Sequence, residues 1–128
     1  MDGPLVMSPR EQRLTKAGEF TALIQHGRML TQGPLMLRAL RRDSGKARFG
    51  FAVGKRVGNA VVRNRTKRRL REILRHLPVD QGWDILVSAR PGAASADYRA
   101  LRGVIITLLQ RGGLLAHPVV GGTGEDRE

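Results

Sequence analysis

The chain of 128 residues carries 23 Lys and Arg but only 11 Asp and Glu, which gives a formal net charge of +12. This length suits one domain with one modest core, and the excess of positive charge predicts an anionic partner, with nucleic acid ahead of an anionic membrane. The absence of cysteine excludes disulfides and cysteine-ligated zinc, and it is compatible with the cytoplasmic location that we expect.

A short helix is the first predicted element. Residues 1–12 contain Gly and Pro and are expected to form a flexible arm. Thr15 can cap a helix that runs to about His26, and Gly27 is expected to end it. The apolar face of this helix is expected to comprise Phe20, Leu23 and Ile24.

Two strands are predicted next, over Pro34–Arg42 and Arg48–Gly54. Asp, Ser and Gly at positions 43–45 form a turn signal, so we expect the two strands to pair as an antiparallel hairpin. In the second strand the bulky side chains share one face. The other face is nearly bare and would let a ligand approach the sheet. Its residues are Gly50, Ala52 and Gly54.

A strongly basic helix follows these strands. Residues 55–75 hold nine basic side chains and one acid, Glu72, so this stretch carries about +8 of the net charge. Asn59 can cap the helix, and Pro78 helps to end it. The cations project away from the apolar stripe and repel one another, which favours a polyphosphate partner. The stripe comprises Val62, Thr66, Leu70, Ile73, Leu74 and Leu77.

The carboxyl-terminal part is predicted to add a strand and a helix. Trp83–Arg90 is a nearly continuous apolar run that suits an interior position in a sheet. Ser95 or Asp97 can cap a last helix that extends to about Gln110, and two glycines follow it. Residues 113–128 are expected to form a disordered tail.

No catalytic or metal-binding constellation is found in the sequence. The acidic residues never form a close pair on one predicted element, and the three histidines lack the spacing of metal ligands. We therefore expect no catalytic residue and no metal ligand in this chain. The longest apolar run, Val104–Leu109, is far too short to span a membrane.

One stretch resembles a known family. Gly58–Glu72, which reads GNAVVRNRTKRRLRE, is similar to the signature of the protein subunit of bacterial ribonuclease P, an RNR core preceded by GNAV and followed by a KR pair. The resemblance extends over about Arg13–Leu109. The amino-terminal pattern of that family, RL then EF then a glycine, is matched by Arg13, Leu14, Glu19, Phe20 and Gly27.

The resemblance implies a fold and a function. The fold is a small α+β domain over residues 13–112, with a mostly antiparallel sheet of about four strands, three helices and a left-handed βαβ crossover through the basic helix. The generic expectation for such a crossover is right-handed. From the residues alone, only three strands are clear. The function is that of the protein component of an endonuclease that matures the 5′ end of tRNA.

In that family the RNA subunit is the catalyst and coordinates Mg²⁺. The small protein binds this RNA, contacts the 5′ leader of precursor tRNA, broadens substrate use and supports metal binding. We therefore expect a monomeric protein, one per ribonuclease P RNA, with no membrane partner. By motif, the residues that bind the catalytic RNA are Lys55, Arg56, Asn59, Arg63, Asn64, Arg65, Lys67, Arg68 and Arg71. The residues that bind the leader are Phe20, Gly50, Ala52 and Arg90.

Alternatives remain at this stage. A non-enzymatic RNA-binding module, such as a ribosomal or assembly protein, would also need a basic helix on a small sheet. A DNA-binding architectural protein is less favoured, because few side chains in the basic helix suit base edges. Phe20 could stack on a leader base or serve as a core residue. The family often has a second aromatic residue at the position of Ile24, and this chain lacks it.

Overall fold

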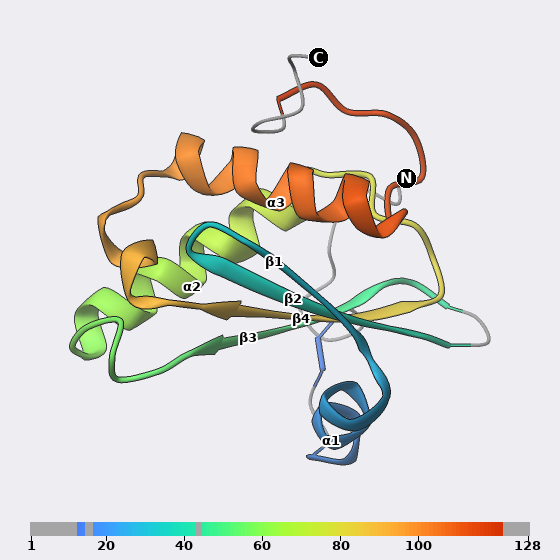
Figure 1. Cartoon of the computed structure of the whole chain (residues 1–128), viewed down its shortest axis with the longest axis horizontal. Coiled ribbons are helices and arrows are strands. Elements are labelled where there is room, and N and C mark those ends of the chain that lie inside the picture. Colours follow the sequence, from blue (N-terminus) through green and yellow to red (C-terminus); the bar gives the residue numbers. More distant parts are fainter. Residues whose placement is uncertain (1–12, 15–16, 43–44, 122–128) are drawn as a thin grey trace.

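The computed structural model describes residues 13–14, 17–42 and 45–121. One four-stranded sheet carries α2 and α3 on one face and α1 alone on the other (Figure 1). The elements in chain order are α1 (Ala17–His26), β1 (Arg28–Gln32), β2 (Leu35–Arg41), β3 (Arg48–Val53), α2 (Ala60–Arg75), β4 (Trp83–Ala89), the 3₁₀ helix η1 (Pro91–Ser95) and α3 (Tyr98–Gly112). This arrangement confirms the α+β class.

The strand order is β1-β2-β4-β3. Strands β1 and β2, and β2 and β4, pair antiparallel, whereas β3 and β4 are parallel and are joined through α2. The expected hairpin between β2 and β3 is therefore wrong, because β4 lies between them. The nearly continuous apolar run of β4 needs cover on both faces and both edges, which only an interior position supplies. The left-handed sense of the crossover stays a prediction.

Strand β1 is the strand that the sequence did not reveal. Its residues are exposed or half-buried, so they lack the alternation of apolar and polar side chains that marks a half-buried strand. A tight turn links it to β2, with Gly33 at a φ of 54°. Glycine adopts this left-handed conformation without strain, and proline follows it at position 34. This Gly-Pro pair is the signal that could have placed the hairpin.

The main core lies between the sheet and the pair of helices α2 and α3. The predicted apolar stripe of α2 is confirmed, since Thr66, Leu70, Ile73 and Leu74 are buried. The Thr66 hydroxyl donates to the Val62 carbonyl oxygen, which satisfies the one polar group in that stripe. The caps are also as expected: the side chains of Asn59 and Asp97 accept from the amides of Val62 and Ala100.

Helix α1 packs on the opposite face through a small cluster. Leu23 is fully buried there, together with Leu14 and Leu86, and Phe20 packs against them. The assignment of Ile24 to the apolar face is wrong, because its side chain is 58% exposed. Consecutive residues of a helix point about 100° apart, so Ile24 points away from the direction of Leu23. The cluster is too small to cover both side chains. Thr15, the expected cap, lies outside the described residues.

The chain keeps contact with the fold for a few residues after α3, although most of residues 113–121 are exposed, and the expected domain boundary at residue 112 stays a prediction. Gly113 adopts φ 67° and turns the chain back toward the core. Leu114 is fully buried, and Leu115 forms a β-bridge with Val79. The amide of Ala116 then donates to the carbonyl of Pro78. The expected arm at 1–12 and the tail after residue 121 lie outside the described residues.

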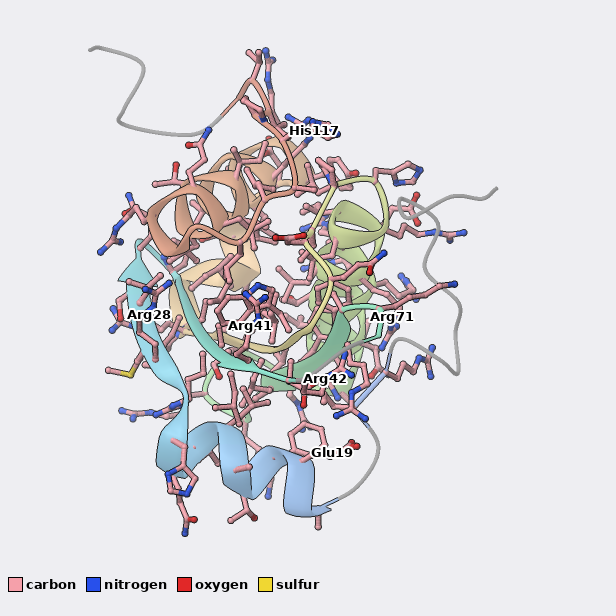
Figure 2. The ribbon with its side chains drawn as sticks, turned by 90° about the vertical axis from the view of Figure 1, so that its right-hand side faces the viewer. Glu19, Arg28, Arg41, Arg42, Arg71 and His117 are labelled. Atoms are coloured by element: carbon pink, nitrogen blue, oxygen red, sulfur yellow. The ribbon has the colours of Figure 1, made fainter. Side chains whose placement is uncertain are left out.

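A buried polar network ties α1 to the sheet. Asp84 of β4 is only 4% exposed, and its carboxylate accepts two hydrogen bonds of 2.8 Å from Arg48 of β3. Arg42 pairs with the same carboxylate at 2.7 Å, and Arg48 reaches Glu19 of α1 at 2.6 Å. Figure 2 shows Glu19 and Arg42 near one another between α1 and the sheet. The hydrogen bonds to Asp84 raise the pKa of Arg48, so its charge is stabilised in the folded state.

We predict that Asp84→Asn destabilises the fold strongly, because it leaves two partly buried guanidinium groups without their shared counter-ion. Removing one partner of a fully buried pair costs about 3–5 kcal/mol, and this variant should approach the lower limit because both arginines are about one-quarter exposed. Urea unfolding measures the effect. The control is Glu72→Gln, which removes an exposed ion pair with Arg75 and should cost less than about 1 kcal/mol. Equal costs would contradict this account of the network.

Candidate nucleic-acid interface

A groove of about 260 Å³ lies between α1, the edge strand β3 and α2. We call it the β3 groove. It is built from three separate parts of the chain, which only the tertiary fold brings together. Its lining residues are Arg13, Leu14, Phe20, Phe49, Gly50, Phe51, Lys67 and Arg71.

Three cations and no acid are found among these lining residues. The Arg71 guanidinium lies over the Phe51 ring, 5.4 Å from its centroid, and Figure 2 shows Arg71 projecting from α2 on this side of the sheet. Burial lowers the pKa of Arg71, and repulsion from Arg13 lowers it further. A guanidinium remains charged at neutral pH nonetheless. The β3 groove is thus a partly desolvated positive site, which an anion would stabilise.

Phe20 forms the α1 wall of the groove by resting on Gly50. A Cβ atom added to Gly50 would lie 2.7 Å from Cε1 of Phe20 and 3.1 Å from Cδ1 of Leu14. The bare surface expected at Gly50 is therefore covered, and Gly50 itself is buried. Its contribution is to admit the ring. Phe20 is half-buried, so it packs in the α1 cluster and also lines the groove.

The other two residues expected at the leader site lie nearby but do not line the groove. Ala52 is exposed and follows Gly50 by two positions, on the same face of β3. Arg90 is exposed just after β4, whose last residue, Ala89, pairs with Val53 at the end of β3. Both residues therefore lie toward the carboxyl end of the parallel pair, and an extended ligand leaving the groove along β3 would pass them.

The cations of α2 separate onto two flanks of the helix. Lys67 and Arg71 line the β3 groove, whereas Arg65 and Arg68 line a different groove beside α3. Lys55, Arg56 and Asn64 are exposed, and Arg63 is half-buried. The Asn59 side chain is committed to the helix cap. The residues expected to bind the catalytic RNA therefore occupy two surfaces rather than one.

Four lining residues were not predicted as site residues from the sequence: Arg13, Leu14, Phe49 and Phe51. Phe51 packs against the main core, as expected for the bulky face of this strand, but β3 is an edge strand and leaves part of the ring accessible beside Arg71. Arg13 is placed by a β-bridge to Phe49, in which the next residue, Leu14, donates its amide to the Phe49 carbonyl at 2.9 Å. The strand order could have suggested the position of Phe51, whereas no local pattern predicts the bridge.

Comparison with known proteins identifies the family. A family model described as Ribonuclease P matches residues 8–113. The ribonuclease P protein component of Gluconacetobacter diazotrophicus is 42% identical over 112 residues, which cover 84% of this chain and 97% of the relative. The chain belongs to the ribonuclease P protein family. The ribonuclease P protein component of Rhodococcus opacus, 38% identical, is matched over its whole length and over 91% of this chain.

Solved structures agree with this assignment. The ribonuclease P protein from Thermotoga maritima has a TM-score of 0.71 at 27% identity, over 77% of this chain and 96% of that chain. The ribonuclease P protein from Staphylococcus aureus has a TM-score of 0.76 at 22% identity, over 89% and 99% of the two chains, and supports the fold alone.

Family membership has direct consequences for function. Ribonuclease P is an endoribonuclease complex, its protein component has the ribonuclease P RNA as partner, and a role in tRNA 5′ maturation fits the chain. The alternatives of a ribosomal protein and a DNA-binding architectural protein are thereby set aside. Within the described ranges, no helix is both long and apolar enough to cross a membrane.

We predict that Gly50→Ala displaces Phe20 from the sheet, because the new methyl group would overlap the ring. Overpacking of this kind costs about 1–3 kcal/mol of stability, and the shifted ring should also weaken any ligand in the β3 groove. Thermal unfolding and precursor tRNA binding measure the two effects. The matched control is Gly18→Ala in α1, where no atom lies within 4 Å of the added Cβ and helix propensity favours Ala. A Gly50→Ala protein as stable as the control would contradict the contact.

Proposed function

We propose that the protein holds the 5′ leader of precursor tRNA in the β3 groove, while the opposite flank of α2 and the loop before the helix bind the catalytic RNA. Lys67 and Arg71, which the motif assigned to the catalytic RNA, are therefore reassigned to the leader. The protein would thereby raise the affinity of the ribonuclease P complex for precursor over mature tRNA. This division uses the two sets of cations that α2 carries on its two flanks.

The observation that carries this proposal is the composition of the β3 groove. A single-stranded leader offers phosphates and unpaired bases. The groove offers three cations for the phosphates and the half-buried rings of Phe20 and Phe51 for the bases, whereas Phe49 is buried. Double-stranded RNA keeps its bases paired and stacked, so it could not use the rings in this way. Both alternatives for Phe20 are supported. The buried part of its ring packs in the α1 cluster, and the exposed part is available to stack on a leader base.

The cleaving groups are proposed to belong to the RNA. No three His, Asp or Glu side chains gather into a possible metal site in the described part of this chain. Mg²⁺ would therefore be held mainly by the RNA subunit. We also propose that one protein binds each RNA and that the complex acts in the cytoplasm. The protein would support metal binding indirectly, because its cations lower the repulsion between phosphates that the metal must otherwise offset.

The direct test is reconstitution with a bacterial ribonuclease P RNA. We expect the protein to restore removal of the leader at a Mg²⁺ concentration at which the RNA alone is inactive. The protein without RNA should cleave nothing. Specific leader removal by the protein alone, or no effect of the protein on the RNA, would contradict the proposal.

The double variant Lys67→Ala, Arg71→Ala tests the groove itself. Removing two phosphate contacts should weaken binding of precursor tRNA to the reconstituted complex and make the log–log dependence on salt shallower by about 1.4, with little effect on mature tRNA. The control is Arg111→Ala, an exposed arginine of α3 that contacts the Thr31 carbonyl at the opposite edge of the sheet. If the control and the double variant behave alike, the β3 groove does not hold the leader.

A further inference from the structure

A second groove, of about 500 Å³, lies on the other flank of α2. We call it the Tyr98 groove. It combines three arginines with an aromatic ring, and neither Tyr98 nor Arg69 belongs to the residues assigned to RNA by motif. Its lining residues are Arg65, Arg68, Arg69, Glu72 and Tyr98.

Tyr98 is an exposed aromatic residue at the start of α3, where the backbone is held by hydrogen bonds. It is the first residue of α3 and is 39% exposed, although a helix of this apolar character buries most of its large side chains. Asp97 caps the helix immediately before it by accepting from the Ala100 amide at 2.8 Å. Arg69 of α2 donates to the Ala96 carbonyl at 3.1 Å, which ties the start of α3 to α2. The start of α3 is therefore fixed beside the arginines, and the Tyr98 side chain stays exposed there.

The charges of this groove also favour an anionic ligand. Glu72 is its one acidic lining residue, and its carboxylate lies 3.5 Å from Arg75 and 3.4 Å from His76, toward the carboxyl end of the helix. Arg65 and Arg68 lie one to two turns earlier on α2. The end of the groove beside these two arginines is therefore positive, and arginine binds phosphate as a planar fork.

We propose that the Tyr98 groove binds one unpaired nucleotide of the ribonuclease P RNA, with the base stacked on Tyr98 and the neighbouring phosphates held by Arg65 and Arg68. This inference rests on the proposed function and adds a specific contact to it. A stacking platform beside cations is the usual way in which proteins hold an unpaired nucleotide. Tyrosine supplies the platform at a low cost in side-chain entropy, because only two χ angles must be fixed.

The position of the groove favours the RNA subunit over the leader. At about 100° per residue, Lys67 and Arg71 lie to one side of the buried stripe of α2, and Arg65 and Arg69 lie to the other. A leader strand in the β3 groove would have to cross the full width of α2 to reach Tyr98. The catalytic RNA is proposed to bind the other flank of α2, which is the flank that carries the Tyr98 groove.

Affinity for the isolated ribonuclease P RNA tests the stacking. Tyr98→Ala should weaken binding about tenfold, in keeping with the loss of one base–aromatic stack, whereas Tyr98→Phe keeps the ring and should bind like the unmodified protein. The preference of the reconstituted complex for precursor over mature tRNA should survive in both variants. Melting temperatures of the two variants, measured alongside, separate a loss of contact from a loss of fold.

Nitration of the ring supplies a readout on the unmodified protein. Tyr98 is the single tyrosine, so nitrotyrosine formed by tetranitromethane can arise only at this position and is the quantity to measure. Ribonuclease P RNA should protect Tyr98 from nitration, and precursor tRNA alone should not. Protection by precursor tRNA alone would assign the groove to the substrate and overturn the proposal.

Equal RNA affinity of the Tyr98→Ala and Tyr98→Phe variants would also overturn it, as would a change of oligomeric state in Tyr98→Ala with unchanged affinity. These failures differ from a failure of the proposed function. If the unmodified protein does not bind or activate the RNA, the proposed function is wrong. If it does both and the Tyr98 variants are alike, only the Tyr98 contact is wrong.

Discussion

The burial of one apolar stripe of α2 determines where the charges of the protein lie. Leu70, Ile73 and Leu74 are almost fully buried, and each contributes about 1.5–3 kcal/mol by leaving water. Repulsion between neighbouring cations on a helix costs only about 0.2–0.5 kcal/mol per pair. The hydrophobic term therefore decides the orientation of the helix, and the cations must occupy the remaining surface. Because the stripe lies against the sheet, they separate onto two flanks, and each flank forms a groove with a different neighbour.

The wall opposite α2 in the β3 groove depends on how α1 is held. The apolar cluster beneath α1 is small, so position and orientation come largely from two further contacts. Phe20 rests directly on Gly50, where no other residue would leave room for the ring. The network of Glu19, Arg48 and Asp84 joins the start of the helix to two strands. Packing and charge pairing on this face of the sheet thus set the distance between the aromatic wall and the cations of α2.

Features that depend only on neighbouring residues in the sequence could be predicted. The stripe, cap and extent of α2 were predictable because helical period and capping are local, and the crossover between parallel strands followed from element order. The prediction of a hairpin between β2 and β3 was wrong, because the order of strands in a sheet depends on which strand most needs an interior position. The exposure of Ile24 and the burial of Leu114 also depend on distant partners. The β3 groove could be predicted only in part, because Arg13 and Phe51 join it through the edge position of β3.

The most direct test of the account is a site-specific cross-link from the sheet to the leader. The chain lacks cysteine, so Ala52→Cys gives one attachment point for a photoreactive group, at an exposed position of β3 two residues beyond Gly50. Ile24→Cys, on the solvent side of α1, is the matched control. In the reconstituted complex, we expect the probe at position 52 to cross-link to nucleotides of the leader and the probe at position 24 to give little product. Cross-links from position 52 only to the mature tRNA body or to the RNA subunit would contradict the account.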